Sequence, residues 1–275
     1  MSQLVLLDCA VGVGAADDGR CRVLQRASEV EQWFCAELTA WKEPPRRCSE
    51  PGQRCAAFAD LAPLYSMTLE EMSMPETRVE MWFDPTCPWA WMTSRWLKNA
   101  QEVRDIEVTF SVMSLSVLNQ GRDLDPDYRR AMDQAWGPVR VAIAVEQAGG
   151  KAALDAYYTA FGEAFHVHGD RDPISVMQKA VSAAGVDVPV AQVSASDELD
   201  DALRASHQRA IDLVGNDVGT PVISFGEGTA YFGPVVSPAP RGEDAGRLLD
   251  GLRMMSAVPG FFELKRSRTV GPILD

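Results

Sequence analysis

Residues 79–97 have the sequence VEMWFDPTCPWAWMTSRWL, in which a strand pattern is followed at once by a helix pattern. Residues 79–84 are an apolar run of strand length that ends at Asp84. A helix is expected next, and its apolar positions include Trp91, Met92, Trp96 and Leu97. Residues 106–115, IEVTFSVMSL, are rich in β-branched and aromatic side chains and predict a second strand. Strand, helix and strand at this spacing predict a right-handed βαβ unit.

The rest of the chain predicts a block of helices, then a hairpin and a last helix. Helical patterns fill residues about 116–216, where Pro138 is expected to kink or split one helix and Gly149-Gly150 to end it. Residues 220–226 and 229–235 predict two strands joined by a Gly-containing turn. The order is therefore β-α-β, helical insertion, β-β-α. This order predicts an α/β, thioredoxin-like fold with an all-helical insertion subdomain.

Residues 1–74 differ from the rest of the chain. They mix Arg, Cys, Gly and Pro without a sustained period, as in KEPPRRCSEPGQRC, and predict a weakly ordered N-terminal extension. Residues 75–275 are then the domain that carries the chemistry. Five of the six cysteines lie in the extension, without CxxC pairing or nearby histidines, and only Cys87 lies in the domain. Neither a metal site nor a disulfide framework is expected.

Composition narrows the classes of partner. The formal net charge is −13, and an acidic chain repels nucleic acid and anionic membrane surfaces. No apolar run approaches the roughly 18 residues of a membrane-spanning helix. The opening MSQLVLLDCAVGVGAADDG has no basic start before its apolar stretch, so it is a poor secretory signal. We expect a cytoplasmic protein that binds neither nucleic acid nor membrane.

Cys87 is the candidate nucleophile. It lies where a strand ends and a helix begins, and Pro88 suits the first helical position. Free backbone N–H groups and the positive end of the helix dipole favour thiolate over thiol there, so a lowered pKa is expected for Cys87. The competing interpretation is an inert buried thiol, which the strand–Cys-Pro–helix context disfavours.

The second landmark is the sequence VGTPVIS, in which Thr220-Pro221 begins a strand. Proline cannot donate a hydrogen bond to a sheet ladder, so it belongs at a strand start. A cis bond would turn the Thr220 backbone toward the start of the first helix, whereas an ordinary trans bond is the general preference of X–Pro. Only the fold argument favours the cis form.

Several separated motifs carry a family resemblance: FDPTCPWAWMTSRW, VMSLSVLN, AWGPVRVAIA, DVGTP, FGPV, PRGEDAG and FFELKRSRT. Together they resemble the DsbA-type oxidoreductases of mycothiol-using bacteria and, more narrowly, the mycothiol-dependent nitroreductase family, from about residue 78 to the end. The resemblance implies a DsbA-like fold, cytosolic location, a homodimer, mycothiol as thiol co-substrate, and nitroaromatic or disulfide substrates. It maps the nucleophile onto Cys87, and the cis-proline with its preceding threonine onto Pro221 and Thr220.

One departure from the family pattern affects the mechanism. Dithiol members have Cys-Pro-Trp-Cys, whereas this chain has Cys87-Pro88-Trp89-Ala90. With no thiol at position 90, oxidised Cys87 is expected to rest as a mixed disulfide with a small thiol and to be released by a second thiolate. Two other functions stay open: a glutathione-transferase-kappa-like conjugating or isomerising enzyme, and a redox-silent binding module. Detection of a Cys87 mixed disulfide would distinguish the thiol-dependent oxidoreductase from both of these other functions.

Three further residues, Trp89, Asn119 and Tyr128, are candidates for the site. Trp89, beside the thiol, is expected to cover a flat substrate, while Trp91 is expected in the core. Asn119 and Tyr128 bracket the loop before the helical insertion and are expected at a pocket mouth. Pro88, Thr220 and Pro221 complete the expected thiol-binding and substrate-binding set. We expect His166 and His168 to be capping or solvated, assign His207 no role, and expect the basic FELKRSRT tail to be solvated rather than to attract an anionic ligand.

Overall fold

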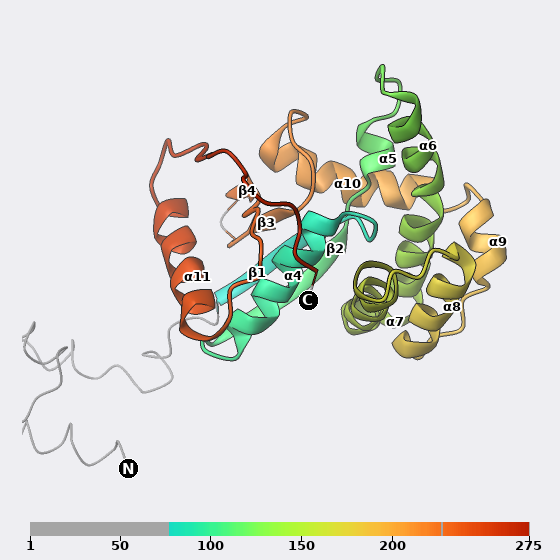
Figure 1. Ribbon diagram of the computed structural model, residues 1–275, viewed down its shortest axis with the longest axis horizontal. Helices are drawn as coiled ribbons and strands as arrows, with labels where there is room; N and C mark the ends of the chain where they lie inside the picture. The colour runs from blue at the N-terminus through green and yellow to red at the C-terminus, as the bar shows by residue number, and fades with distance from the viewer. Residues whose placement is uncertain (1–76, 227, 275) are drawn as a thin grey trace, which may run out of the picture. The chain divides into compact units, whose positions relative to one another are not determined.

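The computed structural model describes residues 77–226 and 228–274 (Figure 1). The strands are β1 Thr77–Phe83, β2 Ile106–Val112, β3 Val222–Ser224 and β4 Ala230–Phe232, and the helices flanking them are α4 Pro88–Gln101 and α11 Gly242–Ser256. The helices between β2 and β3 are α5 Leu115–Leu118, α6 Pro126–Gln134, α7 Trp136–Gly162, the π-helical turn Glu163–Val167, α8 Pro173–Ala184, α9 Val190–Ala195 and α10 Asp200–Val214.

The sheet has the strand order β2-β1-β3-β4. β1 pairs in parallel with β2, while β3 is antiparallel to both β1 and β4. With α4 as the crossover between β1 and β2, and α11 after the hairpin, this is the thioredoxin-like order that the sequence predicted. The helices from α5 to α10 all fall between β2 and β3, so the fold is α/β with an all-helical insertion, as Figure 1 shows to one side of the sheet.

The first helix is fixed to the sheet and to the last helix by its apolar face. Trp91, Trp96 and Leu97 are buried, as the sequence pattern indicated. The indole N–H of Trp96 donates to the carbonyl oxygen of Ala245 in α11 at 3.0 Å. Behind α4, the ring of Phe83 in β1 stacks on Tyr158 of α7 with centroids 3.6 Å apart. These contacts join α4 to α11 and β1 to α7.

The helical insertion differs in detail from the prediction. Pro138 neither kinks nor splits a helix, because it lies in the first turn of α7, where proline is tolerated. The break falls one turn earlier, at Ala135 between α6 and α7. Gly150 leaves helical geometry with φ 72° and ψ −164°, so the helical segment that begins at Trp136 ends at Gly149-Gly150, as predicted, and a second segment of α7 follows directly after the kink. A positive φ of this kind favours glycine.

The hairpin strands are shorter than expected, three residues each instead of seven. The Ser224 hydroxyl donates to the Thr229 carbonyl at 2.8 Å, so a side-chain bond replaces ladder bonds near the turn. None of the described helices combines the length and the apolar character that crossing a membrane requires.

Candidate active site

Cys87 is the N-cap residue of α4. Its backbone N–H donates to the Asp84 carbonyl at 3.0 Å, which closes the turn from β1 into the helix. Its own carbonyl accepts from the Trp91 N–H at 3.1 Å, and Pro88 occupies the first helical position. The side chain is only 6% exposed. The strand end and the helix start therefore set this thiol in place, as the sequence predicted.

Thr220 meets Cys87 from the other half of the chain. The thiol Sγ donates to the Thr220 carbonyl oxygen at 3.5 Å, although the two residues are 133 positions apart. The Thr220–Pro221 peptide bond is cis. The Thr220 hydroxyl oxygen is buried and has no hydrogen-bond partner among the described residues. The two landmarks of the sequence thus form one site.

The expected lowering of the Cys87 pKa is wrong for this structure. Burial raises the pKa of the Cys87 thiol, and the nearby Asp84 charge adds to the rise. The Thr220 contact and the backbone N–H groups of Ala90 and Trp89 lower it, but by less than burial raises it. The helix N-terminus acts in the predicted direction, and desolvation outweighs it. Cys87 in this state is a protonated thiol that donates to Thr220.

Asp84, which the sequence pattern indicated only as the end of a strand, is a buried acid beside the thiol. Its carboxylate accepts from the Thr86 N–H at 2.9 Å, the Thr86 hydroxyl at 2.7 Å and the Leu115 N–H at 2.8 Å. Burial raises the Asp84 pKa, while these hydrogen bonds lower it. Asp84 thereby ties the loop before Cys87 to the start of α5.

Trp89 lies on the first turn of α4, partly exposed, as expected for a residue at the site surface. The Arg268 guanidinium lies over its ring, with 5.0 Å from Cζ to the centroid. Trp91, two residues on, is buried, and its indole N–H has no partner among the described residues. The expectation that the C-terminal tail is solvated is thus incomplete, since Arg268 returns to the active-site helix.

Asn119 and Tyr128 lie on the side of the site formed by the insertion. Asn119 is buried, and its side-chain amide donates to the Leu115 carbonyl at 2.9 Å. Tyr128 is 42% exposed. Partial burial raises the Tyr128 pKa, Cys87 and Asp84 add to the rise, and an interaction with the Asn119 side chain lowers it. Tyr128 therefore lies within electrostatic reach of the thiol, with Asn119 set deeper.

His166 was expected to be capping or solvated, and the expectation of a solvated side chain is wrong. It is buried, 7% exposed, on the π-helical turn after α7. Its Nε2 lies 2.9 Å from the Pro85 carbonyl and donates to it, because a carbonyl oxygen only accepts. Burial lowers the His166 pKa to about 4, so the ring is neutral near pH 7. Wide π-helical turns are frequent at functional sites, but no sequence period predicts them.

His207, which had been given no role, is also buried. Its Nδ1 accepts from the Ser114 backbone N–H at 3.4 Å, at the start of α5. Burial lowers its pKa to about 4. His168, by contrast, is exposed. The two buried histidines bind backbone groups of the loops on either side of Asp84.

Ala90 occupies the position of the second cysteine in dithiol enzymes, and it is 0% exposed. Cys87 is the only cysteine in the described residues and is a free thiol. The five early cysteines lie outside the described residues, as does the whole expected extension. No intramolecular disulfide partner for Cys87 is present in the part of the chain that the structure describes.

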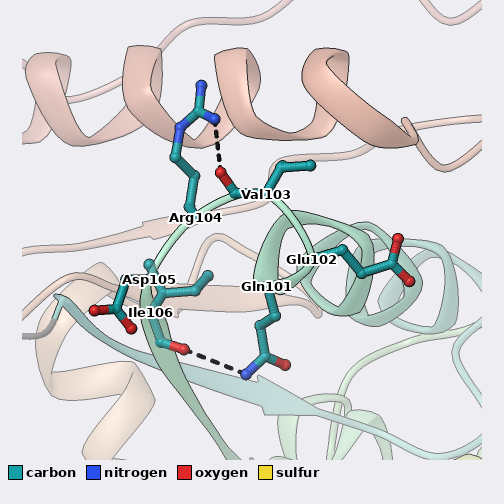
Figure 2. A pocket seen from close by; sticks show the side chains of 6 residues that line it. All are labelled: Gln101, Glu102, Val103, Arg104, Asp105 and Ile106. Atoms are coloured by element: carbon teal, nitrogen blue, oxygen red, sulfur yellow. Dashed lines mark hydrogen bonds between the residues drawn. The ribbon is translucent and has the colours of Figure 1, made fainter. Parts of the chain in front are cut away.

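A surface hollow of about 420 Å³ lies elsewhere, along the turn from α4 to β2 (Figure 2). In this turn the Gln101 amide donates to the Ile106 carbonyl and Arg104 donates to the Val103 carbonyl. Arg104 also pairs with Glu243 and Asp250 of α11. The hollow lies at the opposite end of α4 from Cys87, about 20 Å away along a 14-residue helix. It is a structural corner and not part of the thiol site.

Comparison with known proteins decides the family. Residues 86–266 match the family described as Rv2466c-like, mycothiol-dependent nitroreductase Rv2466c. This match covers more than half of the chain and includes Cys87, Thr220 and Pro221. The chain belongs to this family. It is therefore a thiol-dependent oxidoreductase, as the sequence motifs indicated.

A curated relative and several solved structures are similar to the chain. The uncharacterized protein Rv2286c of Mycobacterium tuberculosis is 28% identical over 196 residues, covering 70% of this chain and 83% of the relative. The probable DsbA oxidoreductase SCO1869 of Streptomyces coelicolor has TM-score 0.47 and 18% identity, over 72% of this chain and 97% of that chain. The cytosolic disulfide reductase DsbM of Pseudomonas aeruginosa has TM-score 0.41 and 19% identity, and the match covers 64% of this chain and 99% of that chain.

Proposed function

We propose that this protein reduces disulfide or nitroaromatic substrates through the single thiol of Cys87, with mycothiol as the electron donor. The observation that carries the proposal is the Cys87 thiol held at the N-terminus of α4 against the Thr220 carbonyl, with Ala90 where a second cysteine would stand. Membership of a family described as mycothiol-dependent nitroreductases supports both the thiol and the substrate class.

The proposed disulfide reaction is a series of balanced exchanges. The Cys87 thiolate attacks one sulfur of the substrate disulfide, forms a mixed disulfide and releases the other half as a thiolate. A mycothiol thiolate then attacks the substrate sulfur of that mixed disulfide, so that Cys87 leaves as a thiolate and the substrate half is bonded to mycothiol. A second mycothiol thiolate releases this substrate half as a thiolate and leaves mycothiol disulfide. For a nitro group, reduction to nitroso takes two electrons and two protons from two mycothiol molecules and yields water and mycothiol disulfide.

The residues around Cys87 have separate parts in this proposal. The backbone N–H groups of Trp89 and Ala90 stabilise the thiolate once it forms, and the Thr220 carbonyl holds the resting thiol. Pro88 and Pro221 shape the two segments that face the sulfur. Trp89, Asn119 and Tyr128 are the proposed substrate contacts, since they lie around the thiol on different elements.

Intact mass spectrometry after exposure to oxidised mycothiol tests the chemistry. The wild-type chain is expected to gain one mycothiol that maps to Cys87, and the Cys87→Ser variant is expected to gain none there and to lose turnover. A serine hydroxyl is scarcely ionised near neutral pH, so it cannot replace the thiolate. Turnover without any mixed disulfide would instead support a conjugating or isomerising enzyme of the glutathione-transferase-kappa kind. If neither turnover nor a mixed disulfide is observed, the result would support a redox-silent binding module.

The same proposal includes cytosolic location and a homodimer. A single unpaired catalytic thiol suits a compartment in which small thiols keep cysteine reduced. Cell fractionation tests the location, and light scattering of the purified chain tests the dimer. Recovery of the protein outside the cytosol would contradict the location, and a monomer mass at micromolar concentration would contradict the dimer. Neither result would bear on the chemistry of Cys87.

A further inference from the structure

The C-terminal segment of residues 262–270, here called the strap, is tethered at both ends beside the thiol site. At its start, the Tyr231 hydroxyl donates to the Phe261 carbonyl at 3.1 Å. At its end, the Ser237 hydroxyl donates to the Gly271 carbonyl at 2.7 Å and accepts from the Ile273 N–H at 3.0 Å. Figure 1 shows this last stretch of chain running back from α11 past β4 to α4. The strap is therefore held near the start of α4.

Arg268 is the strap residue that reaches the site. Its guanidinium lies over the ring of Trp89, two residues after the nucleophile, at 5.0 Å from Cζ to the centroid. A guanidinium stacked on an aromatic face keeps its N–H donors in its own plane, directed away from the ring. None of the ion pairs of the described residues includes Arg268 or its neighbours Lys265 and Arg266. The guanidinium of Arg268 is thus held over Trp89, and no carboxylate of the described residues pairs with it.

The charge of the strap is opposite to that of the chain. The strap contains three basic residues, Lys265, Arg266 and Arg268, and one acidic residue, Glu263. The whole protein, by contrast, has a formal net charge of −13. All four residues are exposed. A local cationic patch on an acidic surface raises the local concentration of anions and of electron-rich oxygen groups. The hydroxyl of Thr220, whose carbonyl contacts the Cys87 sulfur, is buried and has no hydrogen-bond partner among the described residues.

We propose that Arg268, stacked on Trp89, binds the two oxygens of a planar carboxylate or nitro group and so holds a flat aryl substrate beside Cys87. The planar fork of a guanidinium matches two coplanar oxygens with two parallel hydrogen bonds, which lysine cannot reproduce. A nitro group has the same planar two-oxygen shape as a carboxylate. This inference rests on the proposed function and narrows its substrate class to aryl carboxylates and nitroaromatic compounds.

The test is equilibrium binding to the full-length chain carrying Cys87→Ser, so that no turnover interferes. Titration calorimetry compares benzoate, nitrobenzene and the neutral alcohol benzyl alcohol. We expect benzoate and nitrobenzene to bind at least tenfold more tightly than benzyl alcohol. Adding Arg268→Gln should weaken benzoate about ten- to hundredfold and nitrobenzene about tenfold, because hydrogen bonds to charged groups are lost. Arg268→Lys should lose most of the same affinity.

Arg266→Gln is the matched control, with the same charge change on the same strap but no contact with Trp89. This variant should weaken the affinity for benzoate by no more than about threefold, which is the effect expected from losing the general attraction of a surface charge. Equal losses in the two variants, no loss in either, or no preference for benzoate and nitrobenzene over benzyl alcohol would each overturn the proposal.

A separate measurement distinguishes this inference from the proposed function. The mycothiol mixed disulfide of Cys87 is measured on the chain with Arg268 intact. Its absence together with normal benzoate binding would reject the thiol chemistry and keep the role of Arg268. In active enzyme, Arg268→Gln should raise the KM for a nitroaromatic substrate at least tenfold and change kcat by less than threefold, since the side chain binds rather than reacts.

Discussion

At the residue scale, the thiol of Cys87 is subject to opposing influences. Burial and the Asp84 carboxylate raise its pKa, while backbone N–H groups at the start of α4 and the Thr220 contact lower it. The first influence is larger, so the resting enzyme carries a hydrogen-bonded thiol. Reactivity should therefore increase as pH rises, and it should respond to the charge of Asp84.

Asp84→Asn should lower the pKa of Cys87. The substitution removes the negative charge that disfavours thiolate and keeps an oxygen that can accept from Thr86. The measurement is the rate of Cys87 alkylation by iodoacetamide against pH, followed on the Cys87 peptide by mass spectrometry, and its midpoint should move to lower pH. Asp105→Asn, at the far end of α4, is the control and should leave the midpoint in place. An unmoved midpoint in Asp84→Asn would reject the electrostatic coupling.

Ala90→Cys should convert the single-thiol enzyme into a dithiol enzyme. Position 90 is one helical turn from Cys87, and its backbone N–H already faces the sulfur. The new thiol should resolve the mixed disulfide from within, so the rate of that step should depend less on free mycothiol. Substrate reduction across a mycothiol titration measures this, with the wild type as reference. If the rates of wild type and variant depend equally on mycothiol concentration, a thiol at position 90 does not resolve the mixed disulfide, and the prediction fails.

At the element scale, the end of α7 is pressed against the active-site helix. A Cβ placed on Gly162 would lie 2.1 Å from Cε3 and Cζ3 of Trp91, far inside contact distance. This close approach lets the π-helical turn follow directly and bring His166 to the Pro85 carbonyl. The position of the loop before Cys87 therefore depends on a glycine in another helix.

Gly162→Ala should destabilise the protein by about 1–3 kcal/mol, the usual cost of overpacking a filled core. Gly251→Ala is the matched control, because it lies inside α11 with no atom within 4 Å of the added Cβ. That variant should be neutral or more stable by about 0.5–1 kcal/mol. Chemical denaturation gives the free energy of unfolding for both. Equal stability of the two variants would mean that Trp91 moves freely and does not fix the end of α7.

At the scale of the whole molecule, two buried neutral histidines couple folding to pH. Burial lowers the pKa of His166 and of His207 from 6.5 to about 4. Below pH 6.5 the unfolded chain takes up protons at these positions and the folded chain does not. The histidines therefore reduce stability progressively as pH falls from about 6.5 to about 4.

Replacing His166 with glutamine should flatten this part of the stability curve. The amide of glutamine does not titrate, and it keeps a donor for the Pro85 carbonyl. The difference in free energy of unfolding between wild type and His166→Gln should change by about 3 kcal/mol between pH 7 and pH 4, in the direction of relative stabilisation of the variant at low pH. His168→Gln, at an exposed position, should follow the wild type. Parallel curves for wild type and His166→Gln would reject the assignment.

Much of this architecture could be predicted from the sequence, and the reasons for the misses are physical. The sequence predicted the local positions of Cys87, Trp89 and Thr220, because strand, helix and proline signals depend only on neighbouring residues. The sign of the Cys87 pKa shift depends on how completely distant segments bury the sulfur, which no local pattern reports. His166 was missed because its burial depends on a π-helical turn, and the contact of Arg268 with Trp89 joins segments with no shared period.

The separation of 133 positions between Cys87 and Thr220 also has a consequence for the protein during its synthesis. A ribosome adds about 5–20 residues per second, so the cysteine is polymerised about 7–27 s before the carbonyl that will bind its thiol. The intervening residues form α4, β2 and the helical insertion, and all of them must be made before β3 can pair with β1. Throughout that interval the nascent thiol lacks its final cover. The fold thus depends on the cell to keep Cys87 reduced until translation has passed the strand that closes the site.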